Sequence, residues 1–109
     1  MTEAAFNDRF IPDFLRYLKK ALPDIQQIFL SAASQAVRDN VVKIKFWVSK
    51  SATGELSSDE LRWLIAAQMD LTKLNVLKDT GLSLVKIDEF RQAVFHSIVK
   101  SIFKTNILP

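Results

Sequence analysis

Few residues in this 109-residue sequence are of types that commonly carry out chemistry. There is no cysteine, and His96 is the only histidine. His96 lies four residues from both Gln92 and Lys100, which on a helix makes one polar stripe. No serine–histidine–acid or cysteine–histidine arrangement is indicated by the spacing. We therefore interpret His96 as a solvated surface side chain, and the sequence predicts no catalytic residue and no enzyme.

Two pairs of adjacent carboxylates, Asp59/Glu60 and Asp88/Glu89, are the remaining candidates for acid–base chemistry. Both pairs lie where a helix is expected to start, and negative charge stabilises that end of a helix. We interpret them as helix-start residues. A metal site needs several ligands, and one histidine with scattered carboxylates gives no recognisable set. The two glycines stand alone, outside any phosphate-binding loop, so we expect no metal, cofactor or nucleotide.

Composition indicates one helical domain spanning residues 1–109, because a chain of this length can bury a core of its own. Hydrophobic residues make up 49% of it, and 15 basic against 12 acidic residues give a net charge of +3. The N-terminal residues are polar and include acidic side chains, unlike a secretory signal peptide. The longest stretch without a charge is too short to span a bilayer. We expect a cytoplasmic protein.

Turn-forming residues are sparse, and they divide the chain into four helical segments. Pro12 is expected in the first turn of the first helix, where its missing N–H costs nothing, with Phe6, Phe10 and Ile11 forming a short turn before it. Pro23 separates the first two segments. The sequence predicts an all-α fold, a four-helix antiparallel bundle-like domain whose last three helices are long. The segments cover residues 2–22, 24–50, 57–81 and 83–104.

The second segment is ambiguous over residues 41–48. Its apolar residues recur every three or four positions, as in a helix. The same stretch is rich in β-branched residues and alternates, with Val42, Ile44 and Phe46 on one side of a strand. We favour a helix because no second strand candidate is present to pair with it.

Two helix starts are marked in the sequence. Ser57 and Glu60 have the spacing of a capping box, in which each side chain bonds the other residue's backbone N–H. The helix that follows is expected to end near Gly81, which can adopt a left-handed conformation. The last helix begins either at Ser83 or at a cap on Asp88.

The last helix carries more apolar surface than contact with one neighbour requires. Two adjacent stripes leave only a narrow polar side. We infer that apolar faces left over after the chain folds are covered by a second copy or by another helical protein. The sequence therefore predicts a non-catalytic interaction or assembly module. The expected contact residues are Phe46, Trp47, Phe90, Val94, Phe95, Ile98, Val99, Ile102 and Phe103.

Two alternatives remain open at this point. The last helix is cationic and amphipathic, as in proteins that lie on membrane surfaces. Basic clusters interleaved with aromatic residues also occur in proteins that bind single-stranded nucleic acid, although the modest net charge makes nucleic acid the weaker alternative. The three clusters are Arg16/Lys19/Lys20, Lys43/Lys45/Lys50 and Arg91/Lys100/Lys104.

Overall fold

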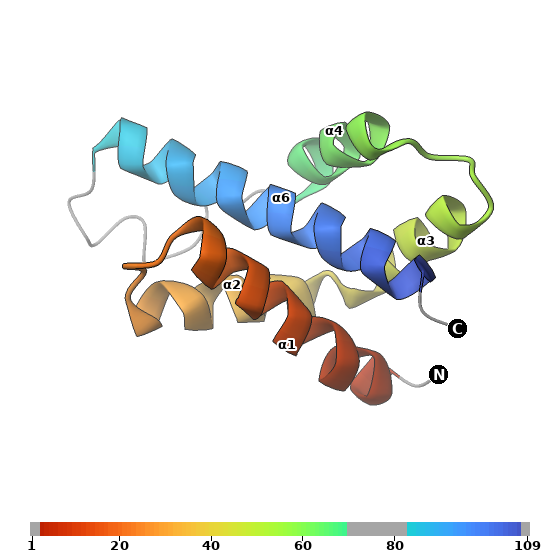
Figure 1. The fold of residues 1–109 in the computed structure, drawn as a ribbon, viewed down its shortest axis with the longest axis horizontal. Helices are drawn as coiled ribbons and strands as arrows, with labels where there is room; N and C mark the ends of the chain where they lie inside the picture. The colour runs from red at the N-terminus through yellow and green to blue at the C-terminus, as the bar shows by residue number, and fades with distance from the viewer. Residues whose placement is uncertain (1–2, 70–82, 108–109) are drawn as a thin grey trace.

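The computed structural model describes residues 3–69 and 83–107, which form five α-helices and no strand (Figure 1). The all-α class is therefore confirmed for the described residues. Five helices replace the four that the sequence predicts. They are α1 (Glu3–Ala21), α2 (Gln27–Asp39), α3 (Val41–Ala52), α4 (Ser58–Gln68) and α6 (Leu84–Ile107).

The extra helix arises because the predicted second segment is interrupted at Asn40. This residue leaves helical geometry, with φ −114° and ψ 20°. Its side-chain amide donates a 2.8 Å hydrogen bond to the carbonyl oxygen of Ala36. Such a bond occupies a backbone carbonyl at the helix end and competes with continued helix. The predicted long second helix is therefore wrong, and α2 and α3 have 13 and 12 residues.

The ambiguous stretch 41–48 lies in α3, so the helical interpretation is confirmed and the strand alternative is wrong. Val41, Ile44 and Trp47 are buried at three-residue steps. Val42 and Phe46, four residues apart, are exposed on another side. This division of faces follows the helical period and differs from the alternation of a strand.

Pro12 lies in the middle of α1, whereas the sequence predicts that it lies in the first turn of a helix. The predicted separate turn before it is therefore wrong. An internal proline removes one backbone hydrogen bond and usually destabilises a helix. Here Phe10 and Ile11 before the proline and Phe14 after it are all buried. Packing of these side chains keeps the helix continuous through Pro12.

The start of α4 confirms the capping box. The Glu60 N–H donates to Ser57 Oγ at 3.2 Å, and the Ser57 N–H donates to Glu60 Oε1 at 3.3 Å. The helix ends at Gln68, earlier than predicted, with Met69 in extended geometry. The predicted stop near Gly81 lies outside the described residues.

Replacing Ser57 with alanine should lower the free energy of unfolding by about 1 kcal/mol, the usual cost of losing an N-cap side chain. Urea unfolding followed by circular dichroism measures this change. Ser58→Ala is the matched control, because Ser58 is the first residue inside the helix, and it should change stability by less than about 0.5 kcal/mol. Equal effects of the two substitutions would contradict the capping role.

The last helix begins at Leu84, so the start at Ser83 is confirmed and the alternative cap at Asp88 is wrong. Ser83 Oγ accepts a 3.2 Å hydrogen bond from the N–H of Lys86. Asp88 and Glu89 therefore lie inside α6 and do not cap it. Glu89 instead forms a 3.4 Å ion pair with Lys86.

The core is built around α6, which packs against α1, α3 and α4 (Figure 1). Two serines on its buried side, Ser97 and Ser101, donate their hydroxyls to the carbonyl oxygens of Ala93 and Ser97 at 2.7 and 2.8 Å. These bonds satisfy the buried hydroxyls inside the helix itself. The largest fully buried side chains are Phe10, Phe14, Leu18, Val37, Ile44, Leu61, Ile65, Met69, Phe95, Ile98 and Ile102.

Candidate interaction surface

Most of the predicted contact residues are covered by the chain's own helices. Phe103 is half-buried. Phe46 is 58% exposed and is the one clearly accessible residue of the predicted set. The seven others are buried in the core: Trp47, Phe90, Val94, Phe95, Ile98, Val99 and Ile102.

The prediction that the last helix keeps a free apolar face is therefore wrong for this folded chain. The broad apolar arc of α6 has a simple cause, because α1, α3 and α4 all contact this helix. A helix in contact with several neighbours buries most of its circumference, and its sequence is apolar accordingly. The apolar arc is broad, as the sequence indicates, but it does not exceed what one copy covers, because the helices that cover it belong to the same chain.

The accessible apolar surface lies on α3. Val42 is 67% exposed and Phe46 is 58% exposed. The two side chains are one helical turn apart on the same side of the helix. Sequence reasoning missed Val42, although the four-residue spacing from Phe46 was a usable signal once the stretch is helical. We refer to Val42 and Phe46 together as the α3 apolar face.

A groove of about 580 Å³ runs between α3 and α4 and includes the α3 apolar face. Its walls come from both helices and from the connection between them. The volume falls within the range of sites that hold a ligand or a partner's side chains. The lining residues are Val42, Lys43, Phe46, Trp47, Lys50, Glu55, Leu56, Leu64 and Gln68.

Cationic side chains border this groove. Lys50 forms a 2.8 Å ion pair with Glu55, and its Nζ lies 5.4 Å from the centre of the Phe46 ring. Hydrogen bonding from Lys50 lowers the pKa of the Glu55 carboxyl below its usual value, so this acid is ionised at neutral pH. Lys43 is exposed beside them. The groove therefore combines an apolar centre with an edge of net positive charge.

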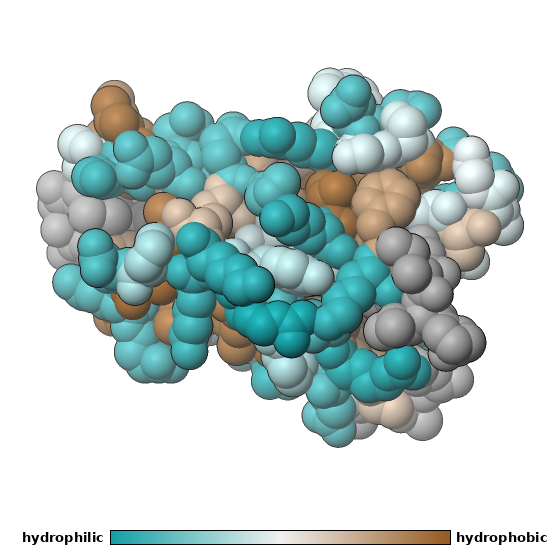
Figure 2. All heavy atoms as spheres, viewed as in Figure 1, coloured by the Kyte–Doolittle hydropathy of each residue, from teal (hydrophilic) through white to brown (hydrophobic). Residues whose placement is uncertain are grey.

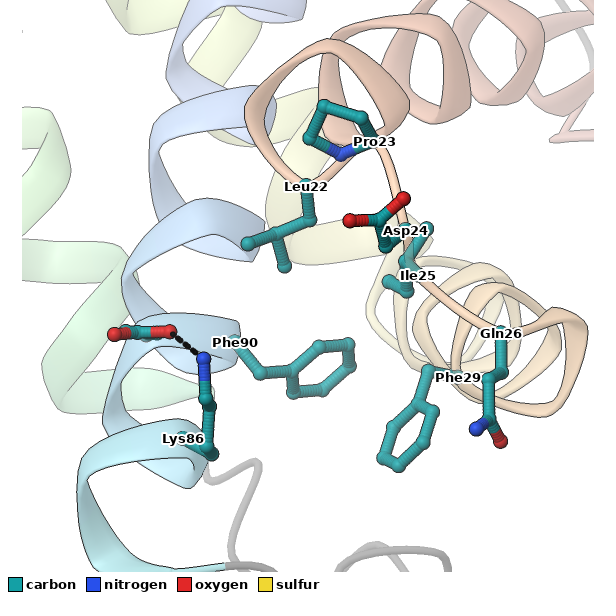
Figure 3. Close-up of a pocket in the computed structure, with 9 residues that line it drawn as sticks. Leu22, Pro23, Asp24, Ile25, Gln26, Phe29, Lys86 and Phe90 are labelled. Carbon is teal, nitrogen blue, oxygen red and sulfur yellow. Dashed lines mark hydrogen bonds and ion pairs between the residues drawn. The ribbon is translucent and has the colours of Figure 1, made fainter.

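A second hollow, of about 310 Å³, lies between the turn that joins α1 to α2 and the first half of α6. Figure 3 shows Phe29 and Phe90 lining it, with the Lys86–Glu89 ion pair at its edge. The two rings meet edge to face, with centroids 5.6 Å apart. Sequence reasoning could not find this hollow, because its walls come from separate parts of the chain.

His96 is exposed on α6, as the sequence predicts. Its pKa is lowered, first because partial burial penalises the charged imidazolium, and further by the nearby positive charges of Lys100 and Arg62. Within residues 3–69 and 83–107, no three histidine, cysteine or acidic side chains gather where they could hold a metal ion. The helices of this same part of the chain include none long and apolar enough to cross a membrane.

The chain was compared with protein-family models, with curated proteins and with solved structures, and it matches none of them. The feature that best fits a site is the α3–α4 groove, because it joins exposed apolar side chains to a concave surface. The predicted site residues Phe46 and Trp47 both line it.

Proposed function

We propose that this chain is a non-catalytic protein-interaction module, and that the α3–α4 groove takes up an apolar helix face from a second copy or from another helical protein. The observation that carries this proposal is the exposure of Val42 and Phe46 beside the groove. Large apolar side chains grouped at a concave surface are typical of interaction sites. The remaining helices act as the scaffold of one bundle-like domain.

The groove suits a helix because of its shape and its composition. An amphipathic helix binds a groove by placing apolar residues from successive turns along it. Phe46 provides an aromatic anchor, and burying an exposed phenylalanine contributes about 1.5–3 kcal/mol. Trp47 and Leu64 continue the apolar lining at the base. Such a contact would bury further apolar surface of the folded chain and leave its core unchanged.

The charges at the groove affect which partner binds best. Two copies that meet through the same groove bring Lys43 and Lys50 of each copy close together. This like-charge repulsion is weakened by salt. Self-association through the groove should therefore become tighter as salt is added. A partner helix with acidic residues at its edges should show the opposite dependence.

Replacing Phe46 with alanine should weaken self-association about 30-fold, equivalent to about 2 kcal/mol, because the residue is the central aromatic anchor. Analytical ultracentrifugation over a range of protein concentrations measures the dissociation constant. Ile28→Ala is the matched control, since Ile28 is 57% exposed but lies on α2 outside the groove. We expect that control to associate like the original protein.

Two results would contradict self-association through the groove. One is a protein that stays monomeric at high micromolar concentration in both low and high salt. The other is an equal loss of association in Phe46→Ala and Ile28→Ala, which would indicate non-specific contact. Flotation with anionic vesicles tests the membrane-surface alternative, whose original basis was an exposed apolar face on α6. That face is buried in the folded chain.

A further inference from the structure

The fold brings two basic clusters that are far apart in sequence onto one surface. Lys104 on α6 forms a 3.0 Å ion pair with Asp13 on α1, and Asp13 also pairs with Arg16 at 2.9 Å. The ring of Tyr17 lies between two cations, with the Arg16 guanidinium 5.4 Å and the Lys100 ammonium 5.5 Å from its centre. The first and third basic clusters of the sequence thus meet around Tyr17.

The register of the two helices extends this surface further. Asp13 lies beside Lys104, and Tyr17 lies beside Lys100, so the helices run antiparallel. His96 lies one turn before Lys100 on α6, and the positive charges that act on it are those of Lys100 and Arg62. Helix α4 adds Arg62, which donates a 2.5 Å hydrogen bond to Gln92 of α6. We define the α1–α6 basic surface as Arg16, Arg62, His96, Lys100 and Lys104.

Positive charge on this surface exceeds the negative charge available to balance it. Asp13 is the acid that pairs with it, and this carboxylate is shared between Arg16 and Lys104. Within the part of the chain that the structure describes, Arg62 and Lys100 form no ion pair. Figure 2 shows hydrophilic residues over much of the face on which α1 lies toward the viewer, with some apolar residues among them. An anionic partner would supply the missing charge.

We propose that the α1–α6 basic surface binds an acidic segment of a partner polypeptide. The surface is positively charged, as binding of an acidic segment requires. Its arginine and lysine side chains can donate hydrogen bonds to the carboxylates of that segment. This site lies on α1 and α6, whereas the groove proposed above lies between α3 and α4. The two proposals can therefore fail independently.

The surface fits an acidic polypeptide better than it fits a membrane or a nucleic acid. A membrane-surface site inserts apolar side chains between lipids. The large exposed apolar residues of the described chain are Ile28, Val42, Phe46, Trp63, Leu84 and Val85. None of them belongs to this surface. Binding to single strands relies on aromatic rings stacked on bases, and Tyr17 is half-buried with two cations against it.

The test uses the full chain and a polyglutamate peptide of about 20 residues at low salt, with binding measured by calorimetry. The double variant Arg16→Gln/Lys100→Gln removes two cations of the surface. We expect its affinity to fall about fivefold, as for two lost exposed ion pairs. Arg38→Gln/Lys86→Gln removes the same number of charges from exposed positions on α2 and near the start of α6, outside both this surface and the α3–α4 groove, and should change affinity less than twofold.

A second readout follows the single histidine by NMR. A bound polyanion stabilises the imidazolium. The pKa of His96 should therefore rise when polyglutamate is added, against the influence of Lys100 and Arg62. The same titration with the Arg16→Gln/Lys100→Gln protein should show a smaller rise. Circular dichroism of both double variants checks that each is folded.

Four outcomes would overturn the proposal. The first is no binding of polyglutamate at low salt. The second is an equal loss of affinity in the two double variants, which would mean that only net charge matters. The third is tighter binding of an oligothymidylate of the same length, which would identify nucleic acid as the partner class. The fourth is tighter binding to vesicles of anionic lipid, which would identify a membrane surface.

Discussion

Replacing Phe95 with alanine should lower the free energy of unfolding by about 3–5 kcal/mol, the usual cost of removing a buried phenylalanine ring. Phe95 is 1% exposed and lies in the middle of α6. The packed helices around it cannot collapse fully into the space that the ring leaves, so a cavity remains. Urea unfolding monitored by circular dichroism measures the loss. A small domain of ordinary stability would be close to unfolding with this substitution.

Phe46→Ala is the matched control for that experiment, because it removes the same ring from an exposed position on α3. We expect it to change the free energy of unfolding by less than about 0.5 kcal/mol. The pair also separates two roles for phenylalanine in this chain. If Phe95→Ala weakened self-association while leaving the stability of the single copy unchanged, Phe95 would face a partner and its place in the core would be wrong.

The second large effect is expected at Trp47. This residue is 2% exposed, on the same side of α3 as the buried Val41 and Ile44. Trp47→Ala should lower the free energy of unfolding by about 3–5 kcal/mol, because the indole is a large part of the contact between α3 and the core. The size of the effect depends on residues 41–48 being helical. In a strand, the side chains of Trp47 and Ile44 would point to different faces, and both could not be buried against the same core.

Trp63→Ala is the control for Trp47, since these are the two tryptophans of the chain and Trp63 is 70% exposed. Its effect on the free energy of unfolding should stay within about 0.5 kcal/mol. Fluorescence gives an independent check. The emission of the Trp63→Phe protein, which comes from Trp47 alone, should be blue-shifted and poorly quenched by iodide. Similar stability losses in both alanine variants would contradict the burial of Trp47.

The interaction surface lies on different helices from those that the sequence indicates. The sequence alone placed it mainly on the last helix, whose apolar residues are part of the core. In the folded chain the accessible apolar side chains at the groove are those of α3, at Val42 and Phe46. Charge is separately concentrated where α1 and α6 meet. An apolar partner and an acidic partner would therefore bind different faces of this protein.

Local features of the sequence determined much of the fold. The capping box at Ser57 and Glu60 marked the start of α4 because its hydrogen bonds are made within one turn of chain. Helical periodicity identified the helices for the same reason, since each helical bond joins residues four apart. The boundary at Asn40 was missed. Asparagine occurs both inside helices and at their ends, and its side-chain bond to Ala36 is seen only in the structure.

By itself the sequence determined an all-helical chain, apolar on broad faces and poor in catalytic residue types. Only the tertiary structure decided what covers each apolar face, because periodicity gives the direction of a side chain and says nothing of its neighbours. It decided in the same way that Arg16 and Lys100 share one surface while Lys43 lies beside the groove. Contacts between residues distant in sequence depend on how the helices pack, and one helix's pattern does not contain that information.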